Sequence, residues 1–342
     1  MQVNKDDFME LMCNVFHQFL AGTKINSFPG NLPISLQRSH LFKLAFGYVI
    51  GLKADGARSF IFIAQGHIFQ IQRNMQITFI GLTSTKDLYL FDGEVIESLD
   101  LILLFDTIIF MGKNVIRVDI TKRNEMARQF LSSFGIIIEN NNSFWEKKRL
   151  PSNFETKVLF VNGSRGWKLQ SKPLFSYYHL KEVWEKRFTL PYSVDGIIFS
   201  RKWNAYQPFR QDPMSLIKWK ELQEITIDFL LLVYDNNDDK EMKRLCDTTS
   251  KLSLYQEKNG NVLLSTTALT DARPIYFSFA TFNHQIVYEY ANVIVECAWD
   301  KNDNNWKFVK VRHDKTTPNT LTTVIETLKN IADPIDIKDF LL

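Results

Sequence analysis

From Tyr48 to Asp119 the chain alternates short apolar runs with turn residues, a pattern typical of an antiparallel sheet. The strands that this pattern predicts are Tyr48–Leu52, Ser59–Ala64, Ile77–Ile80, Leu88–Phe91 and Leu101–Phe110. Apolar residues at helical spacing predict helices over Phe8–Leu20, Asn124–Phe134 and Leu180–Arg187. This half of the chain is therefore expected to form a large sheet system with a few short helices.

A second group of apolar runs begins near Ile225. Its predicted strands are Ile225–Tyr234, Leu252–Gln256, Val262–Leu264, Ile286–Tyr290, Val293–Ala298 and Trp306–Val311. About five short strands within roughly 90 residues fit a small closed barrel such as an OB-fold. A closing helix over Asn319–Ile331 is expected to turn Leu321, Ile325 and Leu328 toward the core. The sequence thus predicts an α+β chain with two domains, an antiparallel-sheet domain over 1–222 and a barrel domain over 223–342.

Composition narrows the classes of function. The 342 residues are 45% hydrophobic, which is enough to bury a core. The 41 basic and 38 acidic residues leave a formal charge of +3, too small to indicate nucleic-acid binding by overall charge. A phosphate site must then come from local clusters of Lys and Arg. The three cysteines show no metal-ligand or disulfide spacing, which is typical of a reducing compartment.

Targeting and membrane signals are weak in this sequence. The first ten residues lack the apolar core of a signal peptide. The longest apolar runs, Leu99–Met111 and Ile225–Tyr234, are interrupted by acidic residues and are too short to cross a bilayer. We therefore expect a soluble intracellular protein, in the nucleus or the cytoplasm, that does not bind membranes.

Three short patterns in the first half carry candidate chemistry. Lys53 ends a predicted strand just before a Gly turn, where its amine can attack a phosphorus atom, although a hairpin with a charged tip looks the same. Glu94 follows an Asp-Gly pair that by itself indicates only a turn. Phe105 lies in an apolar run and is either a core residue or a platform for a base, worth about 1–3 kcal/mol of stacking.

Charged residues near strand ends recur further along the chain. Asp195 precedes a glycine and a predicted strand. On a strand, Lys218 and Lys220 share one face and Trp219 points to the other, which suits either a phosphate site or a solvated edge strand. A last charged group, Arg312-x-Asp314-Lys315, ends a strand before a predicted helix, and a simple solvent-facing surface is its alternative.

Together these patterns occur in one order that resembles the covalent nucleotidyltransferase superfamily of mRNA capping enzymes and polynucleotide ligases. The resemblance covers about residues 28–331. The features more similar to capping enzymes than to ligases are Phe28-Pro29-Gly30 with Pro33, Ser35 and Arg38; Lys218-Trp219-Lys220 followed by Thr226-Ile227-Asp228-Phe229; and Arg312-x-Asp314-Lys315-x-x-Pro318-Asn319. Ala54 departs from the family, which usually has Thr or Ser there. The compact pattern looks most like the guanylyltransferases of large DNA viruses and of eukaryotes.

The resemblance implies an mRNA guanylyltransferase that works in two steps. Lys53 would attack the α-phosphorus of GTP, release pyrophosphate and carry GMP as a lysyl-N-GMP intermediate. The 5′-diphosphate end of an RNA would then accept the GMP and form the GpppN cap. RNA triphosphatase and cap methyltransferase activities would reside elsewhere. An ATP-dependent RNA or DNA ligase and a non-catalytic RNA-binding subunit of the same fold are the alternatives.

The resemblance also assigns roles to single residues. GTP would be bound by Arg58, Arg73, Glu94, Phe105, Lys218, Lys220, Arg312, Asp314 and Lys315. Mg²⁺ or Mn²⁺ would be held by Glu94 and Asp195, since these ions prefer carboxylate oxygens. An ordinary lysine with a pKa of about 10.4 is neutral in only about one copy in 2,500 at pH 7. Cations near Lys53 or partial desolvation would therefore have to activate its amine.

Overall fold

The structure is a computed structural model of the 342-residue chain. It describes residues 10, 13–17, 28–133, 158–160, 165–208, 214–233, 260–265, 276–282, 292–300, 302–303, 305–313, 315 and 317–340. Contacts between Cα atoms divide the chain into two compact units, Met1–Lys220 with Asp336–Leu342, and Glu221–Ile335. The residues from Asp336 onward thus group with the first unit, whereas the sequence placed them in the second domain. The chain is α+β with mainly antiparallel sheets, as predicted.

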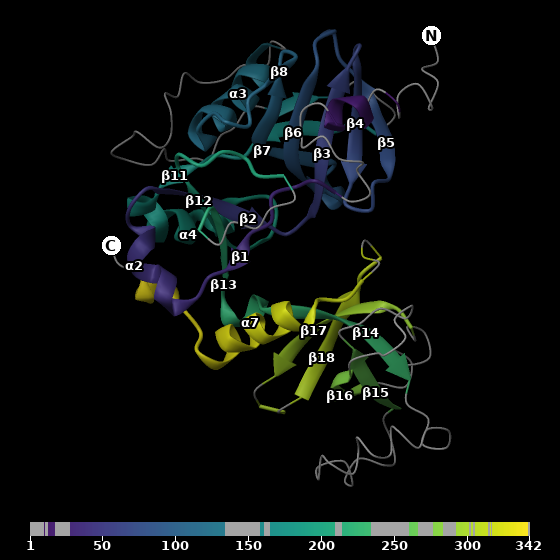
Figure 1. The fold of residues 1–342 in the computed structure, drawn as a ribbon, viewed down its shortest axis with the longest axis vertical. Coiled ribbons are helices and arrows are strands. Elements are labelled where there is room, and N and C mark those ends of the chain that lie inside the picture. Colours follow the sequence, from purple (N-terminus) through teal and green to yellow (C-terminus); the bar gives the residue numbers. More distant parts are fainter. Residues whose placement is uncertain are drawn as a thin grey trace. The chain divides into compact units, whose positions relative to one another are not determined.

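The first unit contains two sheets (Figure 1). In the larger sheet the strand order is β5-β4-β3-β6-β7-β10-β9, with β8 paired to β7. All described neighbours run antiparallel except β7 and β10, which are parallel. The strands are β3 (Ala57–Ala64), β4 (His67–Gln72), β5 (Ile77–Leu82), β6 (Tyr89–Ile96), β7 (Leu101–Phe110), β8 (Lys113–Asn114), β9 (Val158–Phe160) and β10 (Lys168–Ser171). The prediction for β7 is confirmed to the residue, whereas β4, β8, β9 and β10 were not predicted.

Helix α3 (Ile120–Ser133) covers one face of this larger sheet (Figure 1). Its residues Ala127, Phe130 and Leu131 join strand residues in one buried apolar cluster. The helix begins at Ile120 and not at Asn124, so Asn124 lies in the helix interior on the buried face. The packing of this face therefore fixes α3 against β6 and β7.

The smaller sheet has the order β1-β13-β12-β2-β11. Its strands are β1 (Ile34–Ser35), β2 (Tyr48–Ala54), β11 (Phe175–Ser176), β12 (Val194–Arg201) and β13 (Leu216–Lys220). Helix α4 (Leu180–Glu185) places Trp184 edge-on against Trp219 of β13, with ring centroids 4.9 Å apart. Phe340 also packs here, 5.4 Å from Trp219 and 5.5 Å from Phe199 between ring centroids. The last described residue thus completes the apolar core behind this sheet.

Strands β2 and β3 belong to different sheets, although only Asp55 and Gly56 separate them. The hairpin alternative for this segment is therefore wrong. A Cβ atom at Gly56 would lie 2.6 Å from the Val95 carbonyl oxygen and 2.7 Å from the Ile96 side chain. Glycine is required here because the turn passes directly over β6.

The second unit contains one antiparallel sheet in the order β16-β15-β14-β17-β18. Its strands are β14 (Thr226–Val233), β15 (Gly260–Ser265), β16 (Tyr276–Phe282), β17 (Ile294–Asp300) and β18 (Asn305–Val311). The pairings among described residues form an open row of strands, and no closed barrel is found in them. The predicted strands at 252–256 and 286–290 lie outside the described residues, and β16 was not predicted.

Helix α7 (Leu321–Ala332) packs on this second sheet (Figure 1). Val324 and Ile331 are buried among strand residues, whereas Leu321 and Ile325 are exposed. Leu328 packs against this cluster as predicted, so the prediction of the core-facing side is right for Leu328 and wrong for Leu321 and Ile325. Within the described part of the chain, no helix has the length and apolar character needed to cross a bilayer.

Candidate active site

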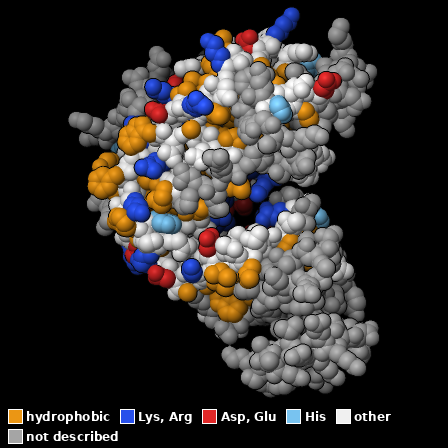
Figure 2. Space-filling model, viewed as in Figure 1, with side chains coloured by type: hydrophobic (Ala, Val, Ile, Leu, Met, Phe, Trp, Pro, Cys, Tyr) orange, Lys and Arg blue, Asp and Glu red, His pale blue; other side chains and the backbone are white. Residues whose placement is uncertain are grey.

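Lys and Arg side chains are scattered among hydrophobic and neutral ones on the described surface in view (Figure 2). One cluster stands out inside the first unit. Gly196 of β12 pairs with Lys53 of β2 on one side and with Lys220 of β13 on the other. Asp195, just before Gly196, lies between the two lysines: Lys53 Nζ is 2.8 Å from both carboxylate oxygens, and Lys220 Nζ is 2.8 Å from Oδ2. Three strands thus bring two ammonium groups onto one carboxylate.

The backbone around Asp195 explains this close approach. The pairing of β12 with β2 shifts between Val194 and Gly196, so Asp195 is the extra residue of a β-bulge. Bulges often redirect a side chain next to a functional site. A Cβ atom at Gly196 would lie 2.0 Å from the Trp219 carbonyl oxygen, so only glycine allows β12 and β13 to come this close.

The two lysines of this cluster lower the pKa of the carboxylate between them. Burial alone would raise the pKa of Asp195, but the ammonium groups of Lys53 and Lys220 hold it below its ordinary value. Lys218 lies two residues before Lys220 with the same half-buried exposure, while Trp219 between them is buried. The predicted alternation along this strand is confirmed. Asp195 stays ionised at neutral pH and keeps Lys53 in place.

Arg58 of β3 is held by a buried carboxylate on β6, the neighbouring strand of the larger sheet. Its Nε and Nη2 donate to the two oxygens of Asp92 at 2.9 and 2.6 Å. The Tyr206 hydroxyl donates to the same carboxylate at 2.6 Å. Asp92 is fully buried within β6, so the interpretation of its Asp-Gly pair as a turn is wrong. The strand simply continues to Ile96 and uses Asp92 to orient the guanidinium.

Glu94, two residues along β6, lies across from Arg58 in the strand pairing. Burial raises its pKa, while the nearby cations Lys53, Lys172 and Arg58 act in the opposite direction. These charges come from both sheets of the first unit. Glu94 is thus a half-buried acid next to the Lys53 cluster.

Lys172 is a site residue that the sequence reasoning missed. It is only 6% exposed, and burial lowers its pKa to about 8, an effect that Lys53 and Arg58 increase and Glu94 opposes. Its only local signal is a Lys-Pro pair in a stretch without clear periodicity. The parallel pairing of β10 with β7 brings Lys172 to the site, and no pattern in the sequence predicts that strand pairing.

Phe105 carries two cations over its ring. The Arg58 guanidinium carbon lies 5.7 Å from the ring centroid, and Lys172 Nζ lies 5.3 Å from it. The pairing of β6 with β7 moves from Asp106 to Leu104 and skips Phe105, which is therefore the extra residue of a second bulge. Phe105 is half-buried while its neighbours are buried. Its ring is therefore partly open to a ligand and is not an ordinary core residue.

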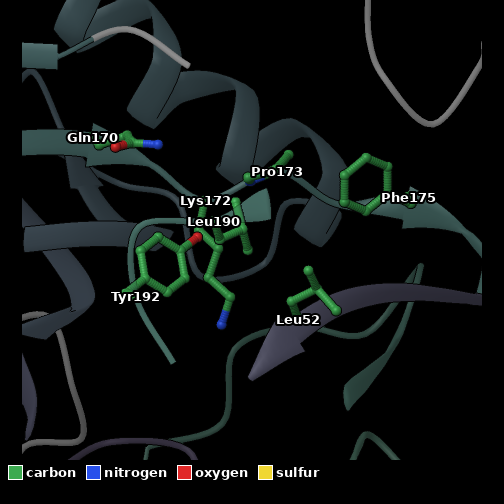
Figure 3. Close-up of a pocket in the computed structure, with 7 residues that line it drawn as sticks. All are labelled: Leu52, Gln170, Lys172, Pro173, Phe175, Leu190 and Tyr192. Carbon is green, nitrogen blue, oxygen red and sulfur yellow. The ribbon is translucent and has the colours of Figure 1, made fainter. Parts of the chain in front are cut away.

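A small pocket borders this cluster (Figure 3). Its lining residues are Leu52, Gln170, Lys172, Pro173, Phe175, Leu190 and Tyr192. The Lys172 side chain runs along this pocket, and in Figure 3 its amine points between Tyr192 and Leu52. Lys172 is therefore shared between an apolar pocket and the charged cluster.

Four predicted site residues remain: Arg73, Arg312, Asp314 and Lys315. Arg73 follows Gln72, which pairs with Ser59, so it lies next to the Arg58 end of β3 with an exposed side chain. Arg312 and Lys315 belong to the second unit. Asp314 lies outside the described residues.

In the second unit, Asp228 organises the basic residues. Arg312 Nη1 is 2.7 and 2.9 Å from its two carboxylate oxygens, and Lys315 Nζ contacts Oδ2. Asn319 donates its backbone N–H to the Asp228 carbonyl at 2.7 Å and accepts the Asp228 N–H at 2.9 Å through its side chain. Glu296 adds a second carboxylate 3.9 Å from Arg312. The two cations are thus held together at one end of β14.

Two carboxylates near Lys53 could bind a metal ion. Among the described residues, no group of three His, Cys, Asp or Glu side chains is placed to hold a metal. Asp195 is buried and Glu94 is half-buried, and both carboxylates are within electrostatic range of Lys53. Mg²⁺ commonly uses one or two protein carboxylates and completes its shell with water and substrate phosphates. Among the described residues, Glu94 and Asp195 are the two carboxylates that fit such an ion.

Comparison with known proteins gives two family matches. Residues 2–222 match the family model described as mRNA capping enzyme, catalytic domain, and residues 224–341 match mRNA capping enzyme, C-terminal domain. The mRNA-capping enzymes of Caenorhabditis elegans and Danio rerio are each 25% identical over 90% and 93% of this chain, which spans 47% and 49% of those proteins. The mRNA-capping enzyme subunit alpha of Kluyveromyces lactis is 22% identical, covering 98% of this chain and 80% of that subunit.

Similar solved structures are more distant. Chlorella virus DNA ligase-adenylate covers 83% of this chain and 99% of its own at 13% identity, with a TM-score of 0.35. Mycobacterial DNA ligase D complexed with ATP and MES covers 79% of this chain and 90% of its own at 10% identity, with a TM-score of 0.41. The chain spans about half the length of the nematode and zebrafish relatives.

Proposed function

Because this chain belongs to the mRNA capping enzyme family, we propose that it is an mRNA guanylyltransferase that carries GMP on Lys53. One observation carries the proposal. The Lys53 amine is half-buried at a strand end, held at 2.8 Å by a carboxylate that also binds a second lysine, beside an aromatic ring with two cations over it. A lysine amine, phosphate-binding cations and a stacking surface are the groups that nucleotidyl transfer to lysine needs.

In the first step, the Lys53 ammonium gives a proton to solvent, and its nitrogen forms a bond to the α-phosphorus of GTP while the bond to pyrophosphate breaks. Lys218 and Lys220 neutralise the α-phosphate on the face of β13 that they share. Arg312 and Lys315 hold the departing pyrophosphate, and Asp314 orients this end of the strand. In such transfers most of the rate enhancement comes from positioning and from cations placed around the phosphoryl group.

In the second step, a terminal phosphate oxygen of the RNA 5′-diphosphate attacks the same phosphorus. The N–P bond breaks, Lys53 recovers a proton, and the RNA leaves with a GpppN cap. Asp195 then receives the restored ammonium, which its low pKa favours. RNA triphosphatase and cap methyltransferase activities are expected on other polypeptides or segments.

The base and the ribose are bound by the second group of residues. Phe105 stacks on guanine, which is worth about 1–3 kcal/mol per base. The buried ammonium of Lys172, 5.3 Å from that ring, can donate to the guanine O6 atom, where adenine has an amino group instead. Arg58 and Glu94 contact the ribose, and Arg73 lies near enough to the end of β3 to assist. Lys172 thus gives a physical reason for choosing GTP over ATP.

A divalent ion completes the proposed site. Glu94 and Asp195 would hold Mg²⁺ or Mn²⁺ together with the nucleotide. Such an ion stabilises negative charge on the phosphates during transfer. Burial raises the pKa of Glu94, so this carboxyl must lose its proton to bind the ion. The positive charge of an arriving cation favours that loss.

The domain assignment follows the same reasoning. We propose a nucleotidyltransferase domain over 1–222 and an OB-fold domain over 223–342, of which the residues from Asp336 onward group with the first unit. The edge strands β16 and β18 of the second sheet have Cα atoms within 8 Å of each other, which supports a rolled, nearly closed sheet. We also propose an intracellular location, nuclear or cytoplasmic, and a compact enzyme similar to the guanylyltransferases of large DNA viruses.

The decisive experiment asks which nucleotide becomes attached. The protein is incubated with α-labelled GTP or ATP and Mg²⁺ or Mn²⁺, then separated on a denaturing gel. We expect a GTP-dependent covalent label on the wild type and none on Lys53→Ala, with exposed Lys113→Ala labelled like the wild type. A label from ATP instead of GTP would establish the ligase alternative. A wild type without any label would reject the proposed function.

A further inference from the structure

Asn124 is a polar residue in an unusual place. It lies within α3 and is only 5% exposed, although asparagine is a weak helix former whose side chain favours caps and turns. Its side-chain Nδ2 donates to the carbonyl oxygen of Phe105 at 3.1 Å and to that of Lys172 at 2.9 Å. An amide NH₂ group has two protons to donate, so both are used. One side chain therefore joins the backbone of the two residues next to each other in the site.

The two carbonyls need a partner because regular pairing fails at both. Phe105 is the extra residue of the bulge in β7 and is skipped by the ladder to β6. On the other strand, the Lys172 N–H makes the last bond of the β7–β10 ladder, to the Leu104 carbonyl at 2.7 Å. Buried backbone carbonyls are almost always hydrogen-bonded in folded proteins. Asn124 supplies that bond where the sheet cannot.

We propose that Asn124 is a positioning residue for base selection, an inference that rests on the proposed function of Phe105 and Lys172. By tying both carbonyls to one amide, it fixes the distance between the stacking ring and the ammonium group. Those two side chains are 5.3 Å apart, from centroid to Nζ. Without the tie, the bulge at Phe105 and the segment after β10 can shift relative to each other, and the ammonium no longer meets the base oxygen.

Other contacts already hold α3 on the sheet. The Thr107 hydroxyl donates to the Arg123 carbonyl at 2.6 Å, and Arg123 forms a bidentate ion pair with Asp106 at 2.7 and 3.0 Å. These bonds join the same helix to the same strand as Asn124 does. They do not reach the Lys172 segment, which makes Thr107 a matched control.

The test measures base preference rather than activity alone. Adduct formation on Lys53 is followed with GTP and with 2-aminopurine riboside triphosphate, which keeps the purine ring and the 2-amino group but lacks the O6 oxygen and the N1 proton of guanine. The ratio of kcat/KM for the two nucleotides reports the contacts to the O6 and N1 edge of the base, of which the Lys172 ammonium can donate only to O6. We expect Asn124→Leu to lower this ratio about tenfold, through KM for GTP, and Thr107→Val to leave it unchanged.

Each outcome bears on the inference. A folded Asn124→Leu protein with the wild-type ratio would overturn it, as would an equal loss in Thr107→Val, which would assign the effect to general packing of α3. If Asn124→Leu does not fold, Asn124→Ala, which leaves room for a water to bond the carbonyls, is measured in the same way. Equilibrium binding of the two nucleotides to the unreacted proteins separates the two hypotheses. A wild type that binds GTP selectively but forms no adduct rejects the transfer proposal, and the Asn124 comparison still decides this one.

Discussion

Raising the pH from 7.5 to 9.5 should stabilise this protein, because it removes the charge of a buried lysine. Burial lowers the pKa of Lys172 from 10.5 to about 8 in the folded chain. Between these two values the unfolded chain binds more protons than the folded one, so the free energy of unfolding rises with pH. Below pH 8 both states are protonated, and the full cost of burying the charge is present.

The size of the effect follows from the two pKa values. A shift of this size makes the charged form about 3 kcal/mol less favourable in the folded state. Of that, about 2 kcal/mol is recovered between pH 7.5 and 9.5, since the unfolded lysine is still largely protonated at pH 9.5. The protein should gain this amount over and above the pH dependence of its other groups.

Urea unfolding at the two pH values measures the gain, and Lys172→Met isolates it. The wild type should gain about 2 kcal/mol more than Lys172→Met over this interval, and the exposed-lysine variant Lys113→Met should behave like the wild type. The same titration should raise KM for GTP above pH 8 in the wild type, because the ammonium that meets O6 is lost. Equal pH dependence of stability in the wild type and Lys172→Met would refute the reasoning that burial controls this lysine.

Two further predictions concern other charged groups. Arg312→Ala should abolish loading of GMP from GTP but spare transfer from preloaded enzyme to diphosphate-ended RNA, because Arg312 acts only on the pyrophosphate; equal loss in both steps would contradict this. Asp106→Asn should lower the free energy of unfolding by about 3–5 kcal/mol, because it leaves the buried guanidinium of Arg123 without its counter-charge. Chemical denaturation measures that loss, and an unchanged midpoint would show that Arg123 finds another partner.

The sequence predicted those strands of the first unit that have long and mainly apolar runs. Leu101–Phe110 has the predicted bounds, and the alternation of Lys218, Trp219 and Lys220 is confirmed. The sequence pattern predicts the wrong structure where the backbone conformation depends on a contact with a distant residue. The Asp-Gly pair at Asp92 has the composition of a turn, yet it is buried inside β6 because Arg58 supplies a counter-charge.

The site itself depends on two bulges that no sequence pattern announces. Asp195 and Phe105 are each the extra residue of a bulge, which turns one side chain toward Lys53 and the other toward Arg58. Lys172 was missed because a lysine before a proline resembles a surface loop, and only its tertiary position makes it a buried cation. For Asn124 the sequence predicts only a place in a helix, because the two carbonyls that its side chain binds belong to residues distant in sequence.

The return of the chain to the first unit after Ile335 has a practical consequence. In topology, Glu221–Ile335 is an insertion into the first unit, whose last piece brings Phe340 against Phe199 and Trp219. Cutting the chain after Lys220 would strip that ring away and leave an apolar surface open to water. A deletion that keeps Phe340, with a flexible linker replacing the inserted residues, is the design that preserves the core behind the site.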